Sequence, residues 1–291
     1  MSEQLLQLLF SGLTLGSIYA LMALALVTTF NISGVMNLAQ GEFAAIGALL
    51  AVTLSGAGIP LPASFAAAVI MVAAAGGIME RAAIHPARGA SGLTLILITI
   101  GLSISLRGLA LLVWGTDTYS LPPFSRGGPL FIGGAALNLQ SLWVMGLVAA
   151  AVTGLHFFLN GTYTGKAVKA SVINRTGARL VGINVGTVSF WAFVGSGALG
   201  AAAGIFIAPI AMAVYDMGFM LGIKGFVAAA IGGLNNAAGA VLGGLLLGVL
   251  EAYGAGLVSS GLKDAFAIIV LMSILLVRPE GILGALGERK I

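Results

Sequence analysis

The sequence predicts an all-α protein, a polytopic bundle of transmembrane helices built as one domain over residues 1–291, with about eight to ten crossings. Only 8% of the residues are charged and 59% are hydrophobic, whereas a soluble domain carries about 25% charged residues. The chain also contains 44 glycines, and small residues let transmembrane helices approach closely. Pairs at i and i+4 are therefore expected to be packing positions: Gly12/Gly16, Gly200/Gly204, Gly218/Gly222, Gly239/Gly243 and Gly244/Gly248.

Apolar windows follow one another along the chain, most of them near the ~20 residues that cross the hydrocarbon core. One window is about twice that length, and Asn235 and Asn236 in its middle predict a turn between two helices. A second window is interrupted by polar residues at 37–42. The windows lie at 5–30, 35–55, 61–79, 93–114, 142–159, 187–213, 218–256 and 265–277.

The distribution of Lys and Arg predicts the orientation, because cytoplasmic loops carry the positive excess. Basic residues place the loops at 81–88 and 161–186 and the tail at 289–290 in the cytoplasm. The loop at 116–140 has no positive bias and is expected outside. Three windows before residue 81 put the N-terminus outside, but a break at 37–42 would put it inside. The side of the N-terminus therefore stays open.

The segment at 161–186, called the basic loop below, is a charged island between apolar windows. It holds Lys166, Lys169, Arg175 and Arg179, four of the chain's 13 Lys and Arg residues, and no acidic residue. Its apolar residues are spaced so that short helices would have an apolar face. By itself this pattern indicates a cytoplasmic loop and leaves open what binds there.

Nucleotide binding and catalysis by this chain are not expected. The sequence at 161–167 is one residue short of a P-loop, and Ala167 stands where a Ser or Thr must reach magnesium. The GxGxxG pattern at 195–200 lies in a charge-free helix with no preceding strand. The two histidines have no metal-binding spacing, and the chain has no cysteine. We therefore expect no cofactor, no metal and no enzymatic activity.

Ionisable residues at membrane depth are costly unless they are paired or hydrated, which makes them candidates for a path across the membrane. Glu42 is the strongest case, and its alternative role is to cap a helix that begins near Phe43. The stretch at 40–47 also resembles that at 224–232, which suggests a pair between Glu42 and Lys224. Arg107 lies nearer a helix end and is expected to snorkel or to line the outer vestibule. The path candidates are Asn37, Gln40, Gly41, Glu42 and Lys224.

Four motifs in order give the chain a resemblance to a known family. The first is NLAQGE at 37–42, and the second runs from the GKA at 165 to the LVGIN that ends at 184. The third is the Gly-rich block at 224–251, and the fourth is RPEGILG at 278–284. Together they resemble the LivH-type permeases, the membrane subunits of ATP-binding-cassette importers for branched-chain amino acids. Gln40 departs from the family pattern, which usually has His there.

The resemblance implies a bacterial inner-membrane importer with several partners. These are a LivM-like second permease, two cytoplasmic ATPases that bind ATP and Mg²⁺, a periplasmic substrate-binding protein and the lipid bilayer; no nucleic acid is expected. The basic loop would hold the coupling helix, with Val172, Ala178, Leu180 and Val181 packed in an ATPase groove and Arg175 and Arg179 facing acidic rim residues. The coupling residues implied are Lys166, Lys169, Arg175, Gly177, Ala178, Arg179, Leu180, Gly182 and Asn184.

The implied function is to form the translocation path for branched-chain or related hydrophobic amino acids. A permease of the same family for urea, short amides or aromatic acids is an alternative, because a path lined by small residues indicates size better than chemistry. From another class, the alternative is a stand-alone channel or secondary carrier. Such a carrier would transport without ATPases, whereas an importer permease would not.

Overall fold

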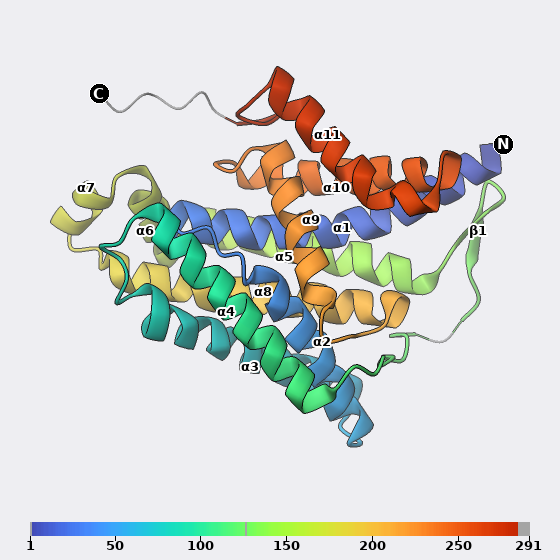
Figure 1. Ribbon diagram of the computed structural model, residues 1–291, viewed down its shortest axis with the longest axis horizontal. Helices are drawn as coiled ribbons and strands as arrows, with labels where there is room; N and C mark the ends of the chain where they lie inside the picture. The colour runs from blue at the N-terminus through green and yellow to red at the C-terminus, as the bar shows by residue number, and fades with distance from the viewer. Residues whose placement is uncertain (1, 126, 285–291) are drawn as a thin grey trace.

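The computed structural model describes residues 2–125 and 127–284, which form a helical bundle (Figure 1). Arg289 and Lys290 of the predicted cytoplasmic tail lie outside the described residues. The α-helices are α1 (Ser2–Ser33), α2 (Gln40–Gly56), α3 (Leu61–Met79), α4 (Gly92–Trp114), α5 (Leu139–Gly161), α6 (Tyr163–Ile173), α7 (Arg175–Leu180), α8 (Val185–Ala211), α9 (Met217–Gly232), α10 (Ala237–Leu257) and α11 (Lys263–Val277). A π-helix, η1 (Glu80–Ile84), extends α3, and a 3-10 turn, η2 (Ser260–Leu262), precedes α11.

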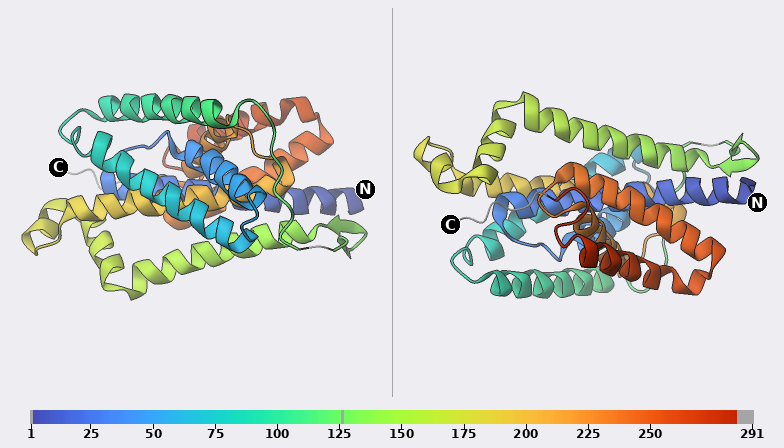
Figure 2. Two further views of the ribbon diagram at one scale, coloured as in Figure 1. Left: turned by 90° about the horizontal axis from the view of Figure 1, so that it is seen from below. Right: turned by 90° about the horizontal axis from the view of Figure 1, so that it is seen from above.

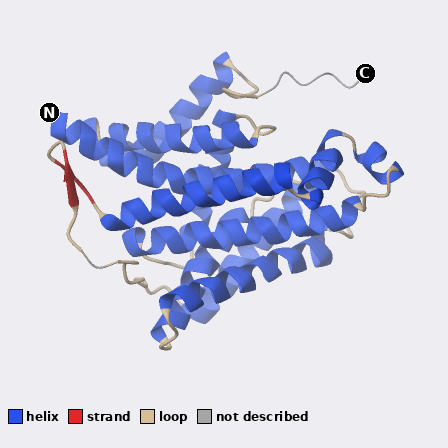
Figure 3. Ribbon diagram, turned by 180° about the vertical axis from the view of Figure 1, so that it is seen from behind, coloured by secondary structure: helices blue, strands red, loops and turns tan. Residues whose placement is uncertain are grey.

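Six helices in the described residues are long and apolar enough to cross a membrane: α1, α3 with η1, α4, α5, α8 and α10. Two shorter apolar helices, α2 and α9, accompany them. The other regular element described is a two-stranded hairpin of β1 (Leu130–Ile132) and β2 (Ala135–Leu137), which stands out in Figure 3. The prediction of a polytopic helical membrane protein is confirmed, whereas the hairpin inside the loop at 116–140 was not predicted.

The two ends of the bundle differ. The N-terminus of α1 and the β hairpin lie at one end, and α6 and α7 lie at the other (Figure 1). The backbone N–H of Ala136 donates to Oε1 of Gln7 over 2.8 Å and so ties the hairpin to α1. Because the basic loop contains α6 and α7, a cytoplasmic basic loop places the N-terminus on the opposite side of the membrane.

Glycines form the seam between α1 and α10. A Cβ added to Gly248 would lie 2.3 Å from the Cα of Gly16, and one added to Gly244 would lie 2.4 Å from the Cα of Ala20. No side chain fits in such a contact, so the two backbones pack directly against each other. The remaining i and i+4 pairs likewise lie against neighbouring backbone atoms, which confirms their predicted packing role.

Two of the apolar windows are broken as the sequence suggested. Helix α1 runs to Ser33, the chain turns at Gly34 with a φ of +74°, and α2 begins only at Gln40. The double-length window divides into α9 and α10, and the Asn236 side chain caps α10 by accepting from the N–H groups of residues 238 and 239. The predicted turn at Asn235 and Asn236 is therefore confirmed.

Candidate functional site

The N-terminal ends of the short helices α2 and α9 meet inside the bundle. A Cβ added to Gly41 would lie 1.9 Å from the carbonyl O of Gly218, and one added to Gly204 of α8 would lie 1.9 Å from that of Ala44. Helix α9 crosses the long helices at a steep angle near this point (Figure 1). Interrupted helices whose N-terminal ends meet in the bundle are the usual architecture of a transporter binding site.

The polar residues at the start of α2 are held by α8. Gln40 is 1% exposed, and its Nε2 donates to the carbonyl O of Ser196 over 3.0 Å, while the Ser196 hydroxyl donates to its Oε1. Oδ1 of Asn37 accepts from the N–H of Ala39 over 3.1 Å. Nδ2 of Asn37 is buried without a partner among the described residues. Because Ser196 lies near the middle of α8, α2 begins deep in the bundle.

Glu42 is tied to α4. Its Oε1 accepts from Oγ of Ser103 over 2.8 Å and from Nη2 of Arg107 over 2.9 Å. The Arg107 guanidinium also lies 4.7 Å from the centre of the Phe219 ring at the start of α9. This Glu42–Arg107 cluster therefore joins α2, α4 and α9, and a carboxylate that is 1% exposed has its charge compensated.

The cluster corrects two expectations. Glu42 does not cap α2, because α2 begins at Gln40 and the carboxylate turns away to side chains of α4. Arg107 does not snorkel, because its guanidinium reaches inward to Glu42. Each residue is ionisable and lies in an apolar window, and that shared property is the sequence signal that favours a pair.

Lys224 belongs to a second cluster. Its Nζ lies 3.0 Å from Oε1 of Glu251 in α10 and 2.7 Å from Oδ1 of Asp264 in α11. The hydroxyl of Tyr19 in α1 donates to the same Glu251 oxygen over 3.4 Å. The cluster thus joins four helices around a buried carboxylate. In the described part of the chain, no three His, Cys, Asp or Glu side chains gather into a possible metal site.

The proposed pair between Glu42 and Lys224 is therefore wrong. The two similar stretches do lie on the two short helices, but in different registers. Gln40 is the first residue of α2, whereas Lys224 is the eighth residue of α9. Lys224 consequently faces α10 and α11, and the start of α9 packs on α2 through Gly218 instead.

The basic loop is folded by side-chain caps. Helix α6 crosses the end of α5 (Figure 2) and is capped by Thr162, whose Oγ1 accepts from the N–H of Gly165. Oδ1 of Asn174 accepts from the N–H of Gly177 over 2.8 Å at the start of α7. The coupling candidates Gly182 and Asn184 lie in the turn that leads from α7 into α8. Gly182 has a φ of +85°, and Asn184 caps α8. The coupling candidates on α6, Lys166 and Lys169, are exposed.

An apolar patch at the end of α7 projects from the bundle. Leu180 is 84% exposed and Val181 is 75% exposed, and we call these two residues the docking patch. Arg179 beside them is exposed too, and so is Val172 on α6. Ala178 is only 3% exposed, so it packs inside the protein and cannot belong to a docking face. Its placement in that face is a correction to the sequence-based prediction.

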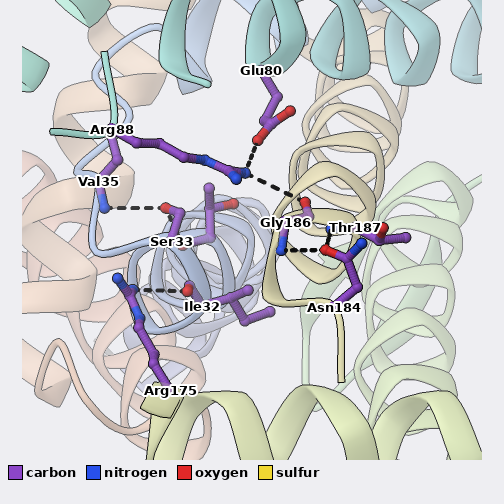
Figure 4. A network of polar contacts seen from close by, with 10 residues as sticks. Ile32, Ser33, Val35, Glu80, Arg88, Arg175, Asn184, Gly186 and Thr187 are labelled. Carbon is purple, nitrogen blue, oxygen red and sulfur yellow. Dashed lines mark hydrogen bonds and ion pairs between the residues drawn. The ribbon is translucent and has the colours of Figure 1, made fainter. Parts of the chain in front are cut away.

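Arg175 connects the basic loop to α1 (Figure 4). Its Nη2 donates to the carbonyl O of Ile32 over 2.8 Å, in the last turn of α1. A cation at a helix C-terminus satisfies a free carbonyl and complements the helix dipole. Arg175 is exposed as well as bonded to α1, and its predicted contact with acidic rim residues of a partner stays a prediction.

A second arginine bridges the neighbouring helix ends (Figure 4). Arg88 pairs with Glu80, a fully buried carboxylate in η1, and its Nη2 donates to the carbonyl O of Gly186 in α8 over 3.3 Å. A small cavity of about 90 Å³ lies between Arg88, Arg175 and Val35 of the α1–α2 linker. The ends of α1, η1 and α8 are therefore held by two arginines next to the basic loop, an arrangement that was not foreseen from the sequence.

Comparisons with known proteins agree with this architecture. Residues 8–275 match the family described as branched-chain amino acid transport system / permease component. The chain is 35% identical to the high-affinity branched-chain amino acid transport system permease protein BraD of Pseudomonas aeruginosa over 98% of both chains. It is 33% identical to LivH of Salmonella typhimurium over the full length of both, and 28% identical to a probable LivH of Methanocaldococcus jannaschii over 92% and 89% of the two chains. No solved structure matches the chain.

Proposed function

Since the chain belongs to the family of branched-chain amino acid transport permease components, we propose that it forms the translocation path of an ATP-binding-cassette importer for branched-chain or related hydrophobic amino acids. A LivM-like second permease, two cytoplasmic ATPases that bind ATP and Mg²⁺, and a periplasmic substrate-binding protein complete the importer. The assembly lies in the bacterial inner membrane. Relatives that match along nearly their whole length support this proposal.

The docking patch is the observation that carries the proposal. Leu180 ends the six-residue helix α7 and Val181 follows it, and both are largely exposed at the end of the bundle that has the positive excess. Exposed aliphatic side chains at the tip of a rigid, capped loop fit a groove on another protein, and a short helix in a groove is a common recognition mode. Arg179, exposed next to the patch, supplies the charge that meets an acidic rim.

Arg175 connects the docking patch mechanically to α1. When the ATPases close on ATP, they displace the docking patch, and the bond from Arg175 to Ile32 carries the displacement to the end of α1. The linker that follows leads directly to Gln40 at the start of α2. Binding of ATP by the partners thereby biases a two-state equilibrium of the helices around the path.

The path passes the point where α2 and α9 meet. At this point Gly41 and Gly218 let the two helix backbones pack closely. The charges of Glu42 and Arg107 compensate each other. The path beside them is therefore suited to small substrates with an apolar side chain. The binding protein supplies most of the selectivity. Urea, short amides and aromatic acids remain the alternatives within the family.

Reconstitution tests the proposal. The permease would be purified alone, and with its second permease and ATPases, and placed in liposomes with the cognate binding protein and ATP. Leucine uptake is expected from the complete assembly and not from the permease alone. Uptake by the permease alone would instead identify a stand-alone carrier. Calorimetric titration of the binding protein with leucine, urea and benzoate separates the substrate classes, and tight binding of urea or benzoate in place of leucine would contradict the substrate proposed.

A further inference from the structure

The small cavity of about 90 Å³ beside the basic loop has two arginines in its wall. Arg88 follows η1 and Arg175 begins α7, and both line the cavity. Figure 4 shows their side chains on either side of Ser33, which also lines it. The apolar part of the wall is formed by Ile32, Val35, Ile84, Leu95 and Val185.

The two arginines leave the cavity with a net positive charge. The charge of Arg88 is compensated by Glu80. Arg175 forms no ion pair with any residue that the structure describes. Its bond to the carbonyl O of Ile32 uses one of the five N–H groups of a guanidinium. A planar guanidinium with free N–H groups matches a carboxylate in both charge and geometry.

Ser189 of α8 adds a third polar group to the wall. The residue is 4% exposed and lines the cavity. Its hydroxyl forms no hydrogen bond with another residue in the described part of the chain, although a hydroxyl can both donate and accept. A small acid in the cavity would satisfy this hydroxyl.

The cavity lies on the same side of α8 as the start of α2. Ser189 and Ser196 are seven residues apart, which is two turns and about 10.5 Å along the helix. Both are buried, and Ser196 holds Gln40 at the point that the proposed path passes. Because α8 begins at Val185 beside the basic loop, the cavity follows this point toward the cytoplasm.

We propose that the cavity is an exit subsite that holds the α-carboxylate of the transported amino acid between Arg88 and Arg175. The inference rests on the proposed function and deepens it. A volume of about 90 Å³ equals that of about three water molecules, which is enough for a carboxylate group. Urea and short amides carry no carboxylate and would not be held there.

Three changes test the subsite. Ser189→Leu fills the cavity, and Ser189→Ala keeps the space open. Ser105→Leu is the matched control, because Ser105 is exposed on α4 and does not line the cavity. Arg88→Gln combined with Glu80→Gln removes one cation without leaving a buried carboxylate unpaired.

The probe is a leucine analogue with a photoreactive diazirine in its side chain, added to nanodiscs that contain the full chain alone. Mass spectrometry maps the labelled peptides. We expect labelling of segments 80–95 and 185–193. Leucine and isocaproate should displace the probe, and leucine amide and phosphate should need at least tenfold higher concentrations.

The variants should separate the cavity from the rest of the chain. Ser189→Leu and the Gln pair should each reduce labelling of the two segments at least fivefold. Ser189→Ala should keep at least half of it, and Ser105→Leu should keep all of it.

Three results would overturn the subsite. Displacement by leucine amide at the concentration of leucine would show that the carboxylate is not recognised. Equal displacement by phosphate would show a site for small anions in general. Labelling that survives both Ser189→Leu and the Gln pair would place the probe elsewhere.

Uptake by the complete assembly distinguishes this inference from the proposed function. Leucine uptake without labelling of the cavity overturns the subsite alone. Absence of both uptake and labelling overturns the proposed function and the subsite with it.

Discussion

The interior of the bundle and the tip of the basic loop place their side chains in opposite environments. In the interior, charged groups are buried and paired, as Glu42 is with Arg107 and as Lys224 is with Glu251. At the tip, Leu180 and Val181 are apolar and exposed to solvent. Buried ion pairs stabilise one arrangement of the helices. Exposed aliphatic side chains at a loop tip contribute a favourable free energy only when another surface buries them.

This difference separates two kinds of function in one small chain. The interior clusters join the helices around the point where α2 and α9 meet, and in the proposed function the tip receives a partner. Arg175 belongs to neither class, because it starts in the basic loop and ends on the last turn of α1. The comparison predicts that interior substitutions act on folding, tip substitutions on transport, and Arg175 on both to a small degree.

The largest effect is expected from Arg107→Met. It leaves the buried carboxylate of Glu42 without its cation, and removal of one partner of a buried pair costs about 3–5 kcal/mol. Denaturant-induced unfolding of the purified protein in detergent measures the loss. Glu42→Gln combined with Arg107→Met should recover at least half of it, since no uncompensated charge then remains. Losses that simply add in the double variant would contradict the pairing.

Substitutions at the tip are expected to change the free energy of unfolding less but to reduce leucine uptake strongly. Leu180→Asp with Val181→Asp should change the free energy of unfolding by at most about 0.5 kcal/mol, as is usual for exposed residues. Leucine uptake by the assembled importer should fall at least about tenfold, corresponding to about 1.4 kcal/mol of coupling. Tyr163→Asp, at an exposed residue of α6 outside the patch, is the control. Uptake that falls equally in the control would remove the special role of the patch.

Arg175→Ala should reduce leucine uptake less than the change at the tip and destabilise the protein less than Arg107→Met. It removes one charge-assisted bond to the α1 carbonyl, and we expect a loss of about 1 kcal/mol in unfolding free energy with a several-fold drop in uptake. Arg179→Ala, which removes an exposed neighbour of the same type, should stay within about 0.5 kcal/mol. If both variants lose the same stability, Arg175 is not an internal connector.

The sequence predicted the helices well because hydropathy adds up over some twenty residues and does not depend on what each helix touches. The break at 37–42 was predictable for the same reason, since polar residues and glycine interrupt an apolar run. The partners of the charges were not predictable. Glu42 and Arg107 are 65 residues apart, and only the placement of α4 against α2 decides that Arg107 is nearer than Lys224.

The short helix α7 shows a second limit. A helix of six residues is too short for its sequence pattern to show which face is buried. The sequence-based prediction therefore placed Ala178 and Leu180 on the same docking face. The cap at Asn174 and the inward bond of Arg175 fix the rotation of α7, and they turn Ala178 inward and Leu180 outward. Tertiary contacts of this kind decide the face of any helix that is too short to have its own stripe.

Cross-linking from the docking patch tests the central claim most directly. The chain has no native cysteine, so Leu180→Cys carries a single reactive group, and Tyr163→Cys gives a matched site on α6. Each would be labelled with a short photoreactive cross-linker in the assembled importer. We predict a covalent product with an ATPase subunit from position 180 and little from position 163. Equal products from both positions, or none from position 180, would contradict the assignment of the docking patch as the site that receives the ATPase.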